Sequence, residues 1–156
     1  MPNHLIKNVQ PSGNAVVITQ TDGSHKAYLT SKWYGTSDGS ILVVLKDTKK
    51  ALRFLDELNF FLPNKKDKIV FFPGYNILPF KSLAYHKETS TNRLAALSKI
   101  MNSDSEPLIV VTVVDTILQK LIPKKNLMDF AELVIANEEI DRDDLVLKLE
   151  SGGYSK

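Results

Sequence analysis

Eight residues, Gln20–Ala27, lie where phosphate chemistry could arise. They join an apolar run to a segment with helical spacing, which is the position of the phosphate-binding pattern G-x-x-x-x-G-K-[ST]. Lys26 stands where this pattern has its lysine. Gln20 and His25 replace the two glycines, and Ala27 replaces the hydroxyl residue that binds Mg²⁺.

Each replacement removes part of a nucleotide site. The glycines let the backbone N–H groups face the phosphates without a Cβ in the way. The loop contains one glycine, Gly23, which is at neither of these two positions. Ala27 offers no oxygen to a metal ion. Lys26 still supplies charge, but a single helical lysine is commonly just solvated. The loop therefore fits either a vestigial P-loop that holds no cofactor or an ordinary strand-to-helix turn. The alternative is an active P-loop NTPase.

The elements that must position this loop follow from four short apolar runs. They are Ala15–Thr19, Ile41–Leu45, Lys68–Phe72 and Pro107–Val114. The last three scarcely alternate, which is typical of parallel strands covered on both faces. Helical spacing falls between the runs, over about residues 24–34, 48–62 and 89–102, and after the last run, over residues 115–121. Asp47 is placed to cap the second helix. We predict an α/β domain over residues 15–122, with a three-layer parallel sheet, preceded by an extension over residues 1–14.

The tail begins a second unit over residues 123–156. Pro123–Asn126 is the predicted boundary, Phe130–Ala136 is the predicted strand, and Asp141 is placed to cap a helix that runs to Glu150. One strand and one helix do not make a stable domain. We therefore expect the chain to stop inside an α+β domain.

Composition excludes several classes of protein. The 156 residues include 20 basic and 18 acidic residues, a net charge of +2, and no cysteine. The balance is too even to indicate by itself a protein that binds nucleic acid or acidic lipid, and a thiolate metal site is impossible. The three histidines lie far apart without spaced carboxylates, so we predict no metal site. No apolar run could cross a bilayer and no secretory signal is present, so we expect a soluble cytoplasmic protein.

An aromatic segment follows the third apolar run. Phe72–Phe80 could stack bases, but only Lys81 adjoins it, so we expect its rings to pack a loop onto the sheet. Tyr75 and Phe80 remain candidates for a contact surface. Three basic clusters, Lys65-Lys66, Lys68 and Lys124-Lys125, fit solvated loops or contacts with DNA phosphates.

Several motifs follow one another in an order that indicates a family resemblance. They are Ile41–Leu45, Arg53–Leu62, Phe71–Phe80, Tyr85-His86, Asn92–Leu97, Leu108–Thr112 and the tail Asp141–Tyr154. Together they resemble the N-terminal region of the transcription-repair coupling factors, from about Val16 onward. In that family, this region is similar to UvrB, the helicase-like subunit of nucleotide excision repair, but its nucleotide site is degenerate. The resemblance implies a P-loop-NTPase-like fold similar to UvrB domain 1a.

The resemblance also implies a function. The full-length family protein is an ATP-dependent DNA translocase that displaces stalled RNA polymerase and recruits UvrA, whereas this region would be a non-catalytic module. No D-E-x-H segment follows a predicted strand, which also argues against ATP hydrolysis. The family's UvrA contacts follow the helix that ends at Gly153-Tyr154, so we expect these residues alone to bind UvrA weakly or not at all. A free-standing small α/β binding protein is a further alternative.

Overall fold

The structure is a computed structural model that describes residues 9–12, 15–18, 21–75, 87–103, 106–129 and 139–151. The chain divides into two compact units, Met1–Leu118 and Gln119–Lys156. The division falls close to the predicted boundary at residues 122 and 123, and the assignment of functional domains to these units stays a prediction.

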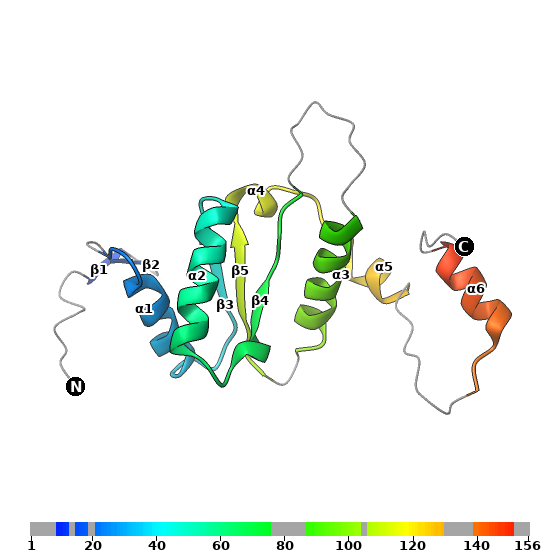
Figure 1. Ribbon diagram of the computed structural model, residues 1–156, viewed down its shortest axis with the longest axis horizontal. Coiled ribbons are helices and arrows are strands. Elements are labelled where there is room, and N and C mark those ends of the chain that lie inside the picture. Colours follow the sequence, from blue (N-terminus) through cyan, green and yellow to red (C-terminus); the bar gives the residue numbers. More distant parts are fainter. Residues whose placement is uncertain are drawn as a thin grey trace. The chain divides into compact units, whose positions relative to one another are not determined.

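The first unit is built on a parallel sheet. Its strands are β3 (Ile41–Leu45), β4 (Ile69–Phe71) and β5 (Ile109–Val113). The order is β3-β5-β4, so the last of the three strands in sequence lies in the middle (Figure 1). A short 3-10 helix over Lys66–Lys68 leads into β4. The α/β class with parallel strands is confirmed.

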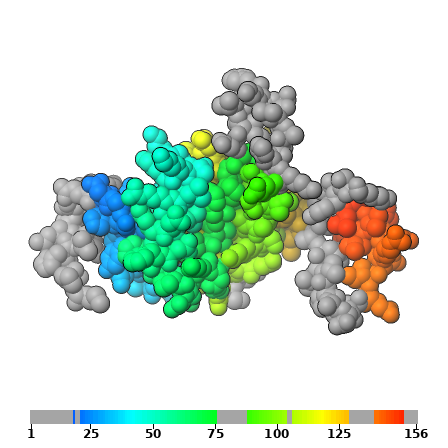
Figure 2. Space-filling view, in the orientation of Figure 1, coloured from blue at the N-terminus to red at the C-terminus, as the bar shows by residue number. Residues whose placement is uncertain are grey.

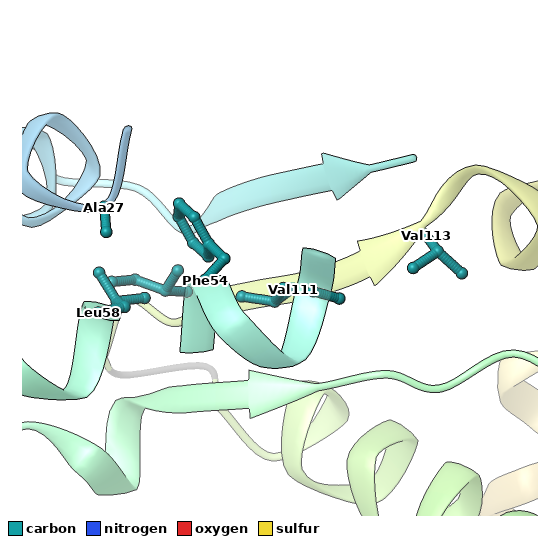
Figure 3. Close-up of a cluster of buried hydrophobic side chains, with 7 residues drawn as sticks. Ala27, Phe54, Leu58, Val111 and Val113 are labelled. Atoms are coloured by element: carbon teal, nitrogen blue, oxygen red, sulfur yellow. The ribbon is translucent and has the colours of Figure 1, made fainter. Parts of the chain in front are cut away.

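Helix α2 (Thr48–Phe61) covers one face of the sheet. The Oδ1 atom of Asp47 accepts a hydrogen bond of 2.8 Å from the backbone N–H of Lys50, which confirms the predicted N-cap. Phe54 and Leu58 on α2 are buried against Val111 and Val113 of β5 (Figure 3). Burial of these side chains ties the helix to the central strand.

Two further helices complete the layers. Helix α1 (His25–Tyr34) packs on α2, and the side chains of the two helices lie next to each other on the surface in Figure 2. Helix α3 (Lys87–Met101) covers the opposite face, where its Ala96 joins a buried cluster with residues of β4 and β5. The described residues therefore form helix, sheet and helix layers.

Strand β3 differs from the expectation. Its side chains alternate between half-buried and exposed, and Leu42 is 62% exposed. Val44, on the same face, is also exposed. One face of this edge strand therefore has no cover among the described residues. The prediction of two covered faces is wrong for β3, because a continuous apolar run does not reveal that a strand lies at an edge.

The first apolar run also differs. Strand β2 (Ala15–Ile18) pairs antiparallel with β1 (Val9–Ser12), with Val9 opposite Ile18. It therefore lies in a two-stranded ribbon and not in the three-stranded parallel sheet. The predicted membership of 15–19 in that sheet is wrong, and part of the predicted extension over residues 1–14 is a strand. Gly13-Asn14, a dipeptide typical of hairpin turns, is the local signal that favours this pairing.

Three short helices lie toward the C-terminus. Helix α4 (Val114–Ile117) is shorter than the predicted 115–121. In the second unit, α5 (Lys124–Asp129) begins within the predicted boundary segment, and α6 (Arg142–Ser151) confirms the predicted last helix. The Oδ1 atom of Asp141 accepts hydrogen bonds from the N–H groups of Asp143 and Asp144, at 2.9 and 3.2 Å. The predicted strand 130–136 lies outside the described residues.

Among the described residues, no helix is long and apolar enough to cross a membrane.

Candidate functional site

The loop before α1 carries the residues at which a P-loop would bind phosphate. Gly23 has a φ of 56°, the left-handed region that favours glycine, and a Cβ built there would meet open space. Ser24 precedes the helix without a side-chain capping bond. Gln20 lies outside the described residues. The glycine is therefore favoured by the backbone of the turn itself.

The three remaining positions of the loop point in different directions. His25 and Lys26 are exposed at the start of α1, whereas Ala27 is completely buried. Ala27 faces α2 in the same cluster as Phe54 and Leu58 (Figure 3). A residue that binds Mg²⁺ must point toward a nucleotide, but the side chain at position 27 points into the apolar core.

A second group of residues gathers at the carboxyl end of β4. The guanidinium of Arg93, on α3, lies 4.5 Å from the ring centroid of Phe72 and 4.0 Å from that of Tyr75. Its Nη1 donates a hydrogen bond of 2.6 Å to the carbonyl oxygen of Pro73. Arg93 is only 3% exposed, so both cation–π contacts act away from bulk water, where they are strongest.

This arrangement favours packing over base stacking for the described part of the aromatic segment, residues 72–75. Tyr75 is half-buried and packs on Arg93, which fits rings that fasten a loop onto the sheet. Phe80 lies outside the described residues. The role of Tyr75 and Phe80 as a contact surface stays a prediction.

The carboxyl end of β5 is closely packed beside this group. Thr116 is 1% exposed, and its Oγ1 has no hydrogen-bond partner among the described residues. A Cβ at Gly74 would lie 2.7 Å from that oxygen. Thr112 donates a hydrogen bond of 2.9 Å to the carbonyl oxygen of Phe72. In open α/β sheets ligands bind at the carboxyl ends of the strands, but here protein atoms fill the space between Gly74 and Thr116.

A cavity of about 360 Å³ opens at the other end of the strands. It is lined by Asp67, Lys68, Lys99, Asn102, Ser103, Glu106 and Leu108. Lys68 forms ion pairs with Asp67, at 3.3 Å, and with Glu106, and thus joins the start of β4 to the segment before β5. Its charge is therefore already balanced by two carboxylates, and the amino ends of parallel strands are not the usual ligand side. We assign this cavity a structural role.

Two pKa shifts occur near this cavity. The hydrogen bond from Lys68 holds the pKa of the Asp67 carboxyl below its usual value, and the charges of Lys68 and Lys99 act in the same direction. Burial, and then the nearby charge of Asp67, raise the pKa of Tyr34. The hydroxyl of Tyr34 donates a hydrogen bond of 2.8 Å to the carbonyl oxygen of Pro107. Both shifts belong to contacts that hold the sheet together.

Among the residues that the structure describes, no three His, Cys, Asp or Glu side chains lie close enough together to hold a metal ion.

The fold and the loop together define a class. The described part of the first unit is a three-layer α/β domain with a strand-to-helix turn that lacks most residues of a phosphate-binding loop. Three curated relatives share one name, transcription-repair-coupling factor. The protein of Haemophilus influenzae is 25% identical over 153 residues, or 96% of this chain. Those of Escherichia coli and Myxococcus xanthus are 26% and 22% identical, each over 92% of this chain.

The chain is therefore similar to the transcription-repair-coupling factors over most of its length, and the resemblance inferred from its motifs is confirmed. It spans 12% of the length of each of these relatives. No family model matches the chain, and no solved structure matches it.

The structure also shows how two of these motifs are connected. Phe72-Pro73-Gly74-Tyr75 and Asn92-Arg93-Leu94 are separate in sequence, yet Arg93 binds both rings and the Pro73 carbonyl oxygen. Sequence reasoning identified the two motifs but missed their contact. An arginine near the start of a helix that follows an aromatic loop was the available signal.

Proposed function

We propose that this chain is a non-catalytic module of a transcription-repair coupling factor and corresponds to the family's N-terminal UvrB-like region. The similarity to three such factors over at least 92% of the chain carries this proposal. The parallel sheet with helices on both faces is compatible with a P-loop-like ancestry.

The module does not hydrolyse ATP. Three of the four signature positions of the phosphate loop are replaced, and Ala27 lies buried in the core. A hydroxyl at position 27 would be directed at α2 and away from a nucleotide. The loop can therefore hold neither Mg²⁺ nor the β- and γ-phosphates by the usual contacts.

In the complete protein, a motor elsewhere in the chain moves along DNA at the expense of ATP and displaces stalled RNA polymerase. The N-terminal region restrains that motor and presents the surface that recruits UvrA for nucleotide excision repair. Contacts with RNA polymerase and DNA belong to the full-length protein. The partner of the present module is UvrA, with weak binding by these residues alone, and the compartment is the cytoplasm.

Calorimetric titration with Mg-ATP at millimolar concentration tests the loss of catalysis. We expect no saturable heat for the wild-type chain or for Lys26→Ala. Saturable binding by the wild type that disappears in Lys26→Ala would establish an active P-loop NTPase in place of the proposed module.

Immobilised UvrA tests the partner. The 156-residue chain should bind weakly, and the same chain extended to include the following residues of its gene should bind tightly. If the extended protein also leaves UvrA unbound, or if the gene encodes a free-standing protein, the proposed role in recruitment is wrong.

A further inference from the structure

Three aromatic rings form a continuous row across the surface of α1 and α2. The ring centroids of Phe60 and Phe61 lie 5.3 Å apart, and those of Phe61 and Tyr28 lie 5.5 Å apart, both edge to face. The Nζ atom of Lys32 lies 5.3 Å from the ring centroid of Tyr28. We call these four residues the aromatic row. It combines π surfaces with a cation.

The fold accounts for only part of this row, because Phe61 packs against the core cluster whereas Phe60 does not. The buried face of α2 consists of Ala51, Phe54 and Leu58, whereas Phe60 is 78% exposed. Tyr28 and Phe61 are half-buried. A phenylalanine that leaves most of its ring in water does little for the core, and its position at the end of a row indicates a surface that meets a partner.

Positive charge is concentrated in the part of the sequence that contains the aromatic row. Residues 25–66, which contain α1 and α2, hold eight basic and four acidic residues, a net charge of +4. The rest of the chain therefore carries −2, because the whole has +2. Helix α1 itself contains Lys26 and Lys32 but no Asp or Glu. Such asymmetry favours an anionic partner.

The acidic groups around the row are partly neutralised. Glu57 on α2 pairs with Arg53 at 2.9 Å. Asp56, one turn before Phe60 on α2, is exposed. The cation that the structure places on the row itself is Lys32.

The shape of the row selects among anionic partners. An acidic peptide that anchors an apolar side chain needs a pocket, but none of these rings lines the cavity described above. A projecting ring offers its face, on which any nucleobase can stack, while a neighbouring lysine contacts a phosphate. Paired bases do not expose their faces. We propose that the aromatic row binds single-stranded nucleic acid, with bases stacked on Phe60 and its neighbours and a phosphate at Lys32. This inference does not depend on the proposed role in repair.

Fluorescence anisotropy with the full chain and a labelled 12-nucleotide oligothymidylate tests this inference at two levels. Wild-type protein should bind the oligomer and should bind an abasic oligomer of the same length about tenfold more weakly, since the stacking of a base contributes most of its specific affinity. Phe60→Ala should weaken binding of oligothymidylate about tenfold and leave binding of the abasic oligomer unchanged. Leu94→Ala removes an exposed apolar side chain from α3, on the other face of the sheet, and should change neither.

The phosphate contact has its own control. Lys32→Gln should make the negative slope of log affinity against log salt shallower by about 0.7, the value for one phosphate on a single strand. Lys26→Gln removes the same charge from the same helix but from a position about 200° around the axis from Tyr28, and should affect the slope less. Circular dichroism of each variant verifies the fold, which these exposed positions should not disturb.

Three results would overturn the inference. They are the absence of oligothymidylate binding by the wild type, equal affinity for the abasic oligomer, and an unchanged affinity in Phe60→Ala. Tighter binding of an acidic aromatic peptide at the same residues, measured by competition, would assign the row to a protein partner instead.

Discussion

The guanidinium of Arg93 lies 4.0 Å from the ring centroid of Tyr75, and the ring of Phe72 faces it at 4.5 Å. This contact fastens the segment that follows β4 to the helix that returns over the sheet. A cation so deeply buried is stable only if neighbouring groups replace its water. Here two rings and the carbonyl oxygen of Pro73 do so.

Replacement of Arg93 should therefore be costly. Arg93→Ala should lower the free energy of unfolding by about 3 kcal/mol, because it removes two desolvated cation–π contacts and one charge-assisted hydrogen bond. Urea denaturation followed by circular dichroism measures the change. Arg53→Ala is the matched control, since that arginine is exposed on α2 and its ion pair with Glu57 contributes less than about 1 kcal/mol. Equal losses in the two variants would contradict the proposed importance of the stacking.

Gly74 and Thr116 should be energetically coupled. A Cβ at position 74 would stand 2.7 Å from the Oγ1 of Thr116, so Gly74→Ala should destabilise the protein by about 1–3 kcal/mol. Thr116→Ala removes the oxygen and leaves room for the new methyl group. In a double-mutant cycle, the loss in the double variant should fall short of the sum of the single losses by at least about 0.5 kcal/mol. Additive losses would show that the destabilisation in Gly74→Ala does not come from contact with the Oγ1 of Thr116.

Restoring a hydroxyl at position 27 should harm the fold without restoring a nucleotide site. Ala27→Thr places extra volume and an unpaired hydroxyl in the core against α2, at a cost of about 2 kcal/mol. Mg-ATP titration should remain flat. The matched control is Ala95→Thr at an exposed position of α3, which should cost only about the difference in helix propensity, less than 1 kcal/mol. Nucleotide binding by Ala27→Thr would mean that the loop geometry is intact.

The ion pair of Asp67 should leave a pH signature. Because the folded-state pKa of Asp67 is lowered, its contribution to stability is present above the unfolded-state pKa and is lost as the pH falls through the folded value. Asp67→Asn should therefore be less stable than the wild type at neutral pH, and the two proteins should converge below the ordinary aspartate pKa of 3.8. Asp38→Asn, in an exposed loop, is the control that removes a carboxylate and leaves the ion pair of Asp67 in place. The measurement is chemical denaturation at a series of pH values.

The raised pKa of Tyr34 works in the opposite sense. Its contribution to stability is complete below the unfolded-state pKa of a tyrosine and disappears as the pH rises through the folded value. Tyr34→Phe, which also loses the bond to Pro107, should abolish this alkaline decline. A variant that declines as steeply as the wild type above pH 10 would contradict the assignment.

Local signals predicted part of this fold well. Asp47 and Asp141 each precede a helical pattern, and both side chains cap their helices as expected. The strand around Val111 was evident from its length and its β-branched residues. Such features depend on neighbours along the chain, which a single sequence displays directly.

Partners across the fold were not visible in the same way. The run Ala15–Ile18 indicates a strand but not which strand it joins, and it pairs with Val9–Ser12. The amino-acid type at position 27 is plain in the sequence, whereas its burial depends on how α1 packs on α2. The contact of Arg93 with Phe72 likewise requires α3 to lie over β4. These relationships arise from tertiary packing, on which spacing within one segment carries no information.

The central place of β5 has a consequence for how the molecule is made. Ile41 and Ile69, at the starts of β3 and β4, both pair with Ile109 of β5, and in the described sheet β3 and β4 do not pair with each other. On a translating ribosome both earlier strands must therefore wait, with their backbone groups unpaired, until the last strand has been synthesised. Contacts between residues so distant in sequence slow folding, and unpaired apolar strands invite aggregation during that interval. Folding of the sheet should be completed only after Val113 has emerged from the exit tunnel, in a single late step.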